Sequence, residues 1–283
     1  MNQIGDSRIV NALCVDVDDL MGALHEAGRA PRNTEYHAFV ETLAVIEDFE
    51  ALGLKATFFV PGLVARNSPR LVKEIQAAGH QIASHGDRHC AVRRLGRQGF
   101  LEDVRASKRT LEDLTGEVVD TYKAPMWSIT RRCAWAYDVL IEAGYRVDHS
   151  AMPPLKRFLG VSANEIVPFR YQKALLVIPP TTIRLAGVAL PFCGGFYTAH
   201  VPVSVQKRQF ARINDQGQPF NYYFHPFEYA PVGENRRIFK HRSLYATLYA
   251  AHAGVFKTHL RKLAPHFRFD RLQVAYQAFL ADG

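Results

Sequence analysis

The chain has 283 residues, of which 48% are hydrophobic and 22% charged, a composition that suits one large α/β domain and excludes a chain disordered throughout. The formal net charge is +8, but the basic residues are dispersed without a zinc-finger, helix-turn-helix or RNA-binding pattern, so no nucleic-acid partner is expected. The 4 cysteines are far apart, no apolar run nears the roughly 20 residues of a transmembrane segment, and no signal peptide is apparent, so we expect a cytoplasmic protein, at most peripheral to the inner membrane.

Short apolar strands alternate with helices along most of the chain. The predicted strands cover residues 9–17, 56–60, 81–83, 118–122, 145–147 and 221–224. Helical spacing of apolar residues predicts helices over 36–52, 69–79, 98–114, 132–143 and 202–214. This alternation indicates parallel βαβ units, arranged in a closed (β/α) barrel or in an open doubly wound sheet.

Two regions depart from the alternation. Residues 152–202 are punctuated by prolines and glycines, which predicts short strands and long loops. About the last forty residues are predicted to be helical, with a possible strand over 267–269.

Acidic residues end the first predicted strand. Asp16, Asp18 and Asp19 follow one another closely there, and strand alternation puts Asp16 and Asp18 on one face. Carboxylates this close repel one another unless a cation compensates them. The alternative is a helix start, where aspartates cap the backbone and complement the helix dipole.

Two histidines follow the third predicted strand, in the segment Ser84-His85-Gly86-Asp87-Arg88-His89. Histidines four residues apart can direct both rings at one metal ion. The spacing alone is weak, because 12 histidines produce such a pair by chance about half of the time. The histidines and the aspartates both follow predicted strands, so the two clusters can meet at the same edge of the barrel. This shared position supports a metal site more than the spacing does.

Three further polar clusters also follow predicted strands. They are Tyr122-Lys123-Ala124-Pro125-Met126-Trp127, Asp148-His149-Ser150 and Phe224-His225-Pro226-Phe227-Glu228. Lys123 can balance the aspartates, although a surface lysine beside a turn proline is the alternative. A single histidine is more often structural than catalytic, but a polar cluster after each of these strands is harder to explain in that way.

Taken in order, these clusters resemble the motifs of the polysaccharide deacetylase family, also called the chitooligosaccharide deacetylase homology domain or carbohydrate esterase family four. The family pattern is a strand-end pair of aspartates, His-x-x-x-His, Arg-x-Pro, a later Asp and a final histidine. The match is closest to the branch associated with bacterial exopolysaccharide and O-antigen assembly, over about residues 9–228. The segments that resemble this branch are Val15-Asp16-Val17-Asp18-Asp19, Tyr122-Lys123-Ala124-Pro125-Met126-Trp127-Ser128-Ile129, Pro191-Phe192-Cys193-Gly194-Gly195 and His225-Pro226-Phe227-Glu228.

The resemblance implies a fold and an activity. The expected fold is a distorted (β/α) barrel of about seven strands, one domain over 1–283 in which 230–283 form a mainly helical C-terminal extension. The expected activity is metal-dependent hydrolysis of an N-acetyl group on an amino sugar, during biosynthesis of cell-surface polysaccharide such as O-antigen, exopolysaccharide or lipopolysaccharide. The substrate is an N-acetylated sugar or oligosaccharide, which the positive charge suggests is phosphate-linked. The alternatives are a metal-free amide or ureide hydrolase of the same fold and an inactive glycan-binding barrel.

The resemblance also implies roles for individual residues. The metal, expected to be Zn²⁺, is bound by Asp18, His85 and His89. Asp16 acts as the general base held by Lys123, the Met126 amide stabilises the oxyanion, and His225 protonates the leaving amine with support from Asp148. Trp127 and Tyr197 are candidate sugar-stacking surfaces, with a core role as the alternative for each.

The match departs from the family in two places. Lys123 stands where the family has arginine, so the charge is kept but the two-pronged grip on a carboxylate is lost. The aspartates allow two registers: either Asp16 is the base and Asp18 the ligand, or the pair is Asp18 and Asp19. Strand alternation favours the first.

Overall fold

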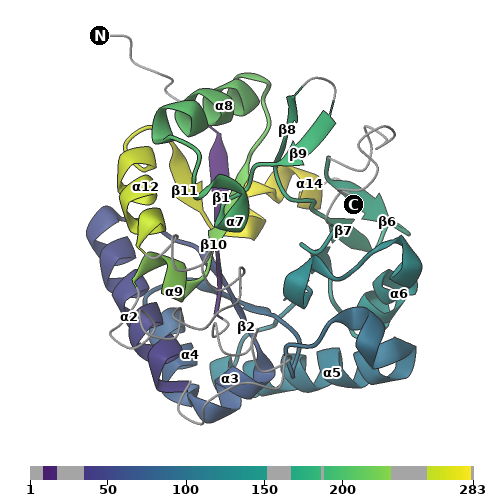
Figure 1. The fold of residues 1–283 in the computed structure, drawn as a ribbon. Coiled ribbons are helices and arrows are strands. Elements are labelled where there is room, and N and C mark those ends of the chain that lie inside the picture. Colours follow the sequence, from purple (N-terminus) through teal and green to yellow (C-terminus); the bar gives the residue numbers. More distant parts are fainter. Residues whose placement is uncertain (1–8, 18–34, 152–166, 186–187, 231–253, 282–283) are drawn as a thin grey trace, which may run out of the picture. The chain divides into compact units, whose positions relative to one another are not determined.

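Strands and helices alternate along the chain (Figure 1). They group into two compact units. The computed structural model describes residues 9–17, 35–151, 167–185, 188–230 and 254–281. The first unit comprises Met1–Thr57, Ala77–Gln81 and Cys193–Tyr276, and the second comprises Phe58–Gln76, Ile82–Phe192 and Gln277–Gly283. The expected metal ligand Asp18 and its alternative Asp19 lie outside the described residues.

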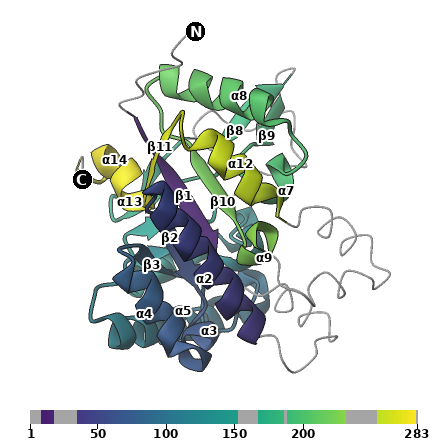
Figure 2. The ribbon, with the colours of Figure 1, turned by 90° about the vertical axis from the view of Figure 1, so that its left-hand side faces the viewer.

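In the first unit, β1 (Val10–Asp16) pairs in parallel with both β10 (Asn221–Phe224) and β11 (Arg268–Asp270). Figure 2 shows α2 (Glu35–Leu52) and α12 (Val255–Leu263) side by side against these strands, with α8 (Val203–Asp215) beyond them. The rings of Phe49 and Phe256 pack on Phe224 of β10, with centroids 6.1 and 5.9 Å away. The aromatic core therefore lies directly beneath the end of β10 that leads into His225.

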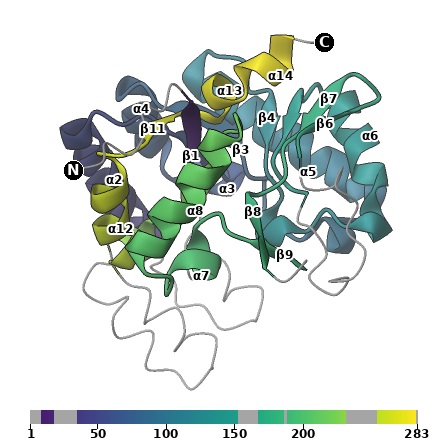
Figure 3. The ribbon, with the colours of Figure 1, turned by 90° about the horizontal axis from the view of Figure 1, so that it is seen from above.

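In the second unit, β3 (Gln81–Ser84), β4 (Thr121–Tyr122), β5 (Val147–Asp148) and β7 (Leu175–Val177) pair in parallel in that order. β6 (Phe169–Tyr171) runs antiparallel beside β7, and β8 (Thr182–Leu185) pairs with β9 (Val188–Pro191) as a separate antiparallel ribbon. Figure 3 shows α5 (Val92–Thr115) and α6 (Trp135–Glu142) against this sheet. The remaining elements are α3 (Gly62–Asn67), α4 (Pro69–Ala77), β2 (Thr57–Val60), α7 (Gly195–Thr198), α9 (Pro226–Tyr229), α13 (Leu272–Ala275) and α14 (Gln277–Ala281).

Most elements follow the sequence-based expectations, and two of the differences have a clear local cause. α5 begins at Val92, earlier than predicted, because it continues across a kink at Gly96, whose φ is 65°. Glycine disfavours helix in a sequence pattern, so this first turn carries no helical signal. α3 was not predicted, since Pro61-Gly62 indicates a turn that closes the strand. The single barrel domain with an extension over 230–283 stays a prediction, and residues 231–253 lie outside the described part.

Candidate functional site

Asp16 and His225 lie next to each other in the first unit because of the strand register. Val15 of β1 pairs with Phe224 of β10, so the residues that follow them emerge at the same edge. Nε2 of His225 is 3.9 Å from Oδ2 of Asp16, whose side chain is buried. A carboxylate facing an imidazole across this distance is a pair suited to holding and moving protons.

Glu228 orients His225 from within α9. One oxygen of its carboxylate accepts both the backbone amide of His225, at 2.9 Å, and the Nδ1–H group, at 2.8 Å. Because a carboxylate only accepts, Nδ1 carries the proton and Nε2 is the nitrogen directed toward Asp16. The role of Glu228 was missed from sequence, although a polar residue followed three positions later by glutamate at a helix start is a capping-box pattern.

The Gly194-Gly195 pair adjoins the same strand. The amide of Tyr223 donates to Cys193 O at 2.7 Å, and a Cβ at Gly194 would lie 2.0 Å from Tyr223 O, so only glycine fits there. The backbone at Gly194 also has a φ of 99°, which favours glycine. Tyr197, on α7, is half-buried, and its sugar-stacking role stays a prediction.

His85 and His89 form a pair in the second unit. Their ring centroids are 5.0 Å apart, and Nδ1 of His85 donates to Lys123 O at 2.8 Å. Since a carbonyl only accepts, His85 carries its lone pair on Nε2, as a histidine metal ligand held by an outer partner does. His89 has a φ of 55°, a strained backbone for a residue other than glycine.

The two imidazoles of His85 and His89 fit a divalent ion that takes nitrogen ligands. Two neutral imidazoles suit Zn²⁺ and related ions. A catalytic zinc site has three protein ligands and a water molecule in the fourth position, so one more protein ligand is needed. Within the described ranges, no group of three or more His, Cys, Asp or Glu side chains is arranged to hold a metal. The expected third ligand, Asp18, is outside those ranges.

Lys123 is buried next to two aromatic rings. It is 1% exposed, and its Nζ lies 4.3 Å from the ring centroid of Trp127 and 5.4 Å from that of Phe59. Met126 precedes Trp127 in a single 3-10 turn, Pro125–Trp127, with a φ of 55° and half of its surface exposed. The predicted roles of Lys123, Met126 and Trp127 in the reaction stay predictions.

Asp148 ends β5 and is fully buried. Its oxygens accept from Ser150, from Oγ at 2.5 Å and from the amide at 3.1 Å, and the same Oγ accepts the Ala124 amide at 2.7 Å. Burial raises the pKa of Asp148 to about 7, against the lowering effect of these bonds. Asp148 is therefore tied to the loop that carries Lys123, while its predicted support of His225 stays a prediction.

His149, for which sequence predicted no role, sits in the same layer. Its Nδ1 donates to Ile178 O at 2.8 Å, and its ring meets that of Trp127 at 5.0 Å in an edge-to-face arrangement. The ring of Phe59 stacks beside it at 6.0 Å. Trp127 thus contacts both a buried cation and a buried imidazole of this unit.

Known proteins resemble the chain in sequence. Residues 40–147 match the family model described as polysaccharide deacetylase, and residues 149–277 match a domain of unknown function, DUF3473. A peptidoglycan deacetylase of Helicobacter pylori is 27% identical over 150 residues, which are 51% of this chain and 50% of that protein. A peptidoglycan-N-acetylglucosamine deacetylase of Listeria monocytogenes is 28% identical over 93 residues, which are 33% of this chain and 20% of that protein.

The fold of the chain is shared by a solved crystal structure. It is that of a candidate polysaccharide deacetylase from Mycobacterium smegmatis, with a TM-score of 0.65 at 18% identity, covering 96% of this chain and 91% of that one. This likeness confirms the predicted fold class, a deacetylase-type (β/α) barrel. Among the helices that the structure describes, none has the length and apolar character needed to cross a membrane.

Proposed function

Because the chain belongs to the polysaccharide deacetylase family through residues 40–147, we propose that it removes an N-acetyl group from an amino sugar. The observation that carries the proposal is the pair His85 and His89, which lies within the matched residues with ring centroids 5.0 Å apart. The hydrogen bond from His85 to Lys123 O supports a ligand role, since it leaves the lone pair on Nε2.

In the proposed reaction, His85, His89 and Asp18 hold a divalent ion, with Zn²⁺ as the expected metal. When bound, such an ion supplies Lewis acidity and lowers the pKa of its bound water to about 7. Within this ligand set, the imidazole nitrogens of the two histidines support the choice of Zn²⁺.

The remaining roles belong to side chains and one backbone amide of this chain. Asp16 accepts a proton from the attacking water, and Lys123 balances the charge of this base. The amide of Met126 donates to the developing oxyanion. His225 donates a proton to the leaving amine, which needs an acid because an amide anion is a poor leaving group. The Glu228 carboxylate supports this step by holding the His225 ring.

The proposed substrate is an N-acetylated sugar or oligosaccharide used in cell-surface polysaccharide synthesis, O-antigen or exopolysaccharide, on the cytoplasmic side. The relatives named as peptidoglycan deacetylases support an N-acetylated glycan as the substrate class. The formal charge of +8 supports a phosphate-linked form of that sugar. A metal-free amide hydrolase and an inactive glycan-binding barrel are the alternatives that the assay separates.

The test combines metal content with acetate release. Protein purified without added metal is expected to contain about one equivalent of a transition metal and to release acetate from N-acetylated oligosaccharides. Asp16→Asn is expected to keep the metal and lose turnover, whereas Asp113→Asn, an exposed aspartate on α5, is expected to keep both. Metal-free protein that takes up no metal on titration would overturn the metal-dependent mechanism, and metal-loaded protein without acetate release would favour the binding barrel.

A further inference from the structure

The segment between the two histidines is tied to α3. Gly62 and Leu63, in the first turn of α3, donate their amides to Gly86 O and Asp87 O, each at 2.9 Å. The amide of Gly86 in turn points to Ser84 Oγ at 3.4 Å. The backbone of this short loop is therefore hydrogen-bonded both to α3 and to the side chain of Ser84, the last residue of β3.

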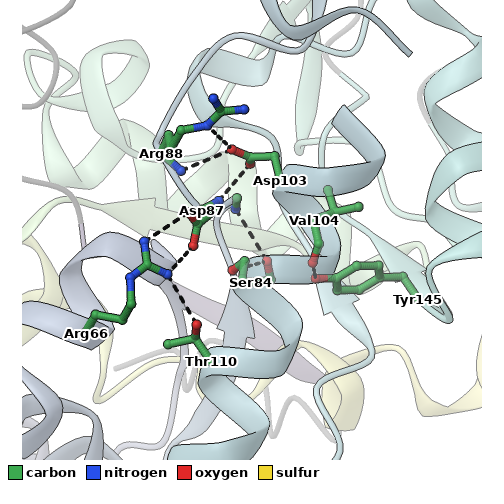
Figure 4. Close-up of polar contacts among 10 residues, drawn as sticks. Arg66, Ser84, Asp87, Arg88, Asp103, Val104, Thr110 and Tyr145 are labelled. Carbon is green, nitrogen blue, oxygen red and sulfur yellow. Dashed lines mark hydrogen bonds and ion pairs between the residues drawn. The ribbon is translucent and has the colours of Figure 1, made fainter. Parts of the chain in front are cut away.

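Asp103, on α5, holds the other side of the loop (Figure 4). Its Oδ2 accepts the amide of Asp87 at 2.7 Å, and its Oδ1 accepts the amide of Arg88 at 3.2 Å and the Arg88 Nε–H at 3.1 Å. The side chain of Asp103 is 2% exposed, whereas that of Arg88 is 55% exposed. A buried carboxylate is therefore engaged by both consecutive amides that lead toward His89.

Asp87 is engaged away from the histidines. Its carboxylate forms a two-pronged pair with Arg66 of α3, at 2.5 and 3.0 Å, and Arg66 also donates to Thr110 of α5 at 3.2 Å. Figure 4 shows Arg66, Asp87 and Asp103 as one polar network across α3, the loop and α5. The acidic residue inside the His-x-x-x-His motif thus braces the loop.

Gly86 packs closely against the carboxylate of Asp103. A Cβ at Gly86 would lie 2.9 Å from Asp103 Oδ2, and the φ of Gly86 is 73°. Ser84 and Ser107 add a hydroxyl contact of 2.8 Å between β3 and α5. Glycine at this position lets the carboxylate of Asp103 reach the loop amides directly.

We propose that Asp103 is a positioning residue that sets metal affinity by fixing the backbone between His85 and His89. The inference rests on the proposed function, because it requires that this pair bind the metal. A carboxylate accepts from both loop amides at once, and these charge-assisted bonds are stronger than bonds between neutral groups. In Asp103→Asn, one of the two oxygens becomes an NH₂ donor, which must face an N–H group of Asp87 or Arg88. The loop then loses one anchor, and the two imidazoles lose their fixed spacing.

The experiment measures the zinc dissociation constant of the full chain by competition with a chelator, together with the visible spectrum of the Co²⁺-loaded protein. Asp103→Asn is expected to raise the dissociation constant about tenfold or more, as loss of an outer partner does at other metal sites. It is also expected to change the Co²⁺ spectrum. Asp113→Asn makes the same chemical change at an exposed position of the same helix and is expected to alter neither.

The outcomes separate the inference from the function on which it rests. Wild-type protein that binds no zinc overturns both. Wild-type protein that binds zinc, with an unchanged dissociation constant and Co²⁺ spectrum in Asp103→Asn, overturns only the positioning role, even if the melting temperature falls. If Asp103→Asn does not fold, Arg66→Gln replaces it, since the Arg66 side chain is 43% exposed. That variant is expected to weaken zinc binding relative to Arg70→Gln, a control on α4 whose side chain is 77% exposed, and equal affinities overturn the inference.

Discussion

The Nδ1 atom of His225 lies 2.8 Å from Oε2 of Glu228, and this oxygen also accepts the amide of His225. One buried carboxylate therefore sets both the tautomer and the direction of the imidazole, with Nε2 facing Asp16 at 3.9 Å. The ring of Phe227 stacks on that of His225, with centroids 5.1 Å apart, and limits its rotation. The orientation of this histidine is built into the strand-to-helix turn that carries it.

Glu228→Gln is expected to lower kcat about 100-fold while the zinc content is unchanged, because the protonated ring loses the negative charge of its carboxylate partner. Steady-state kinetics with metal analysis measures both quantities. The exposed Glu102→Gln on α5 is the control and is expected to behave as wild type. Wild-type kcat in Glu228→Gln would remove this glutamate from the reaction.

Asp148 is expected to make stability depend on pH. Its pKa is raised by burial to about 7, whereas an unfolded aspartate ionises near 3.9. Between about pH 4 and about pH 7 the folded state keeps a proton that the unfolded state has lost, so stability falls as pH rises, by about 1.4 kcal/mol for each pH unit. Below about pH 4 both states are protonated, so stability stops changing with pH through this group and is at its highest with respect to it.

Urea unfolding of wild type and Asp148→Asn across this pH range tests the effect. The variant is expected to lack this component, so that its stability relative to wild type increases from about pH 4 to about pH 7. Asp113→Asn, an exposed aspartate, is expected to follow the wild-type curve. Parallel curves for wild type and Asp148→Asn would show that Asp148 is already ionised in the folded protein at low pH.

Gly194→Ala is expected to destabilise the first unit strongly. The added Cβ would meet backbone atoms of Tyr223, with the nearest contact at 2.0 Å, and the backbone there already has a positive φ. Gly217→Ala is the matched control, since it has a φ of 75° but nothing within 4 Å of the added atom. Only the cost of the left-handed conformation, about 1–2 kcal/mol, is expected there. Chemical denaturation compares the two, and equal losses would contradict the close approach of Gly194 to Tyr223.

Trp127 is expected to stabilise the buried Lys123 through its ring face. Trp127→Leu removes the aromatic ring 4.3 Å from the Nζ atom of Lys123, whereas Trp127→Phe retains a ring. The leucine variant should be less stable than the phenylalanine variant by about 0.5–2 kcal/mol. Unfolding measurements test this, and a KM determination tests the separate prediction of sugar stacking. Equal stability combined with a raised KM in the leucine variant would assign Trp127 to the substrate alone.

The alternation of strands and helices was readable from sequence, because apolar periodicity reports which face of each element is buried. It predicted β1, β3 and β10 within one or two residues of their observed ends. The polar residues at these ends were also readable, since Asp16 ends β1, His85 follows β3 and His225 follows β10. The start of α5 was not, because its first turn contains a glycine with a positive φ.

By itself the sequence determined the family resemblance, the fold class and the strand ends at which polar residues gather, all of which depend on local order along the chain. Only the tertiary structure decided which distant side chains contact the polar residues at these strand ends. The pairing of Asp103 with the Asp87 amide joins residues 16 positions apart through the packing of a helix against a loop. The pairing of Asp16 with His225 depends on strand register. Register and helix packing are set by long-range contacts, and no local pattern specifies which distant side chain will reach a given backbone group.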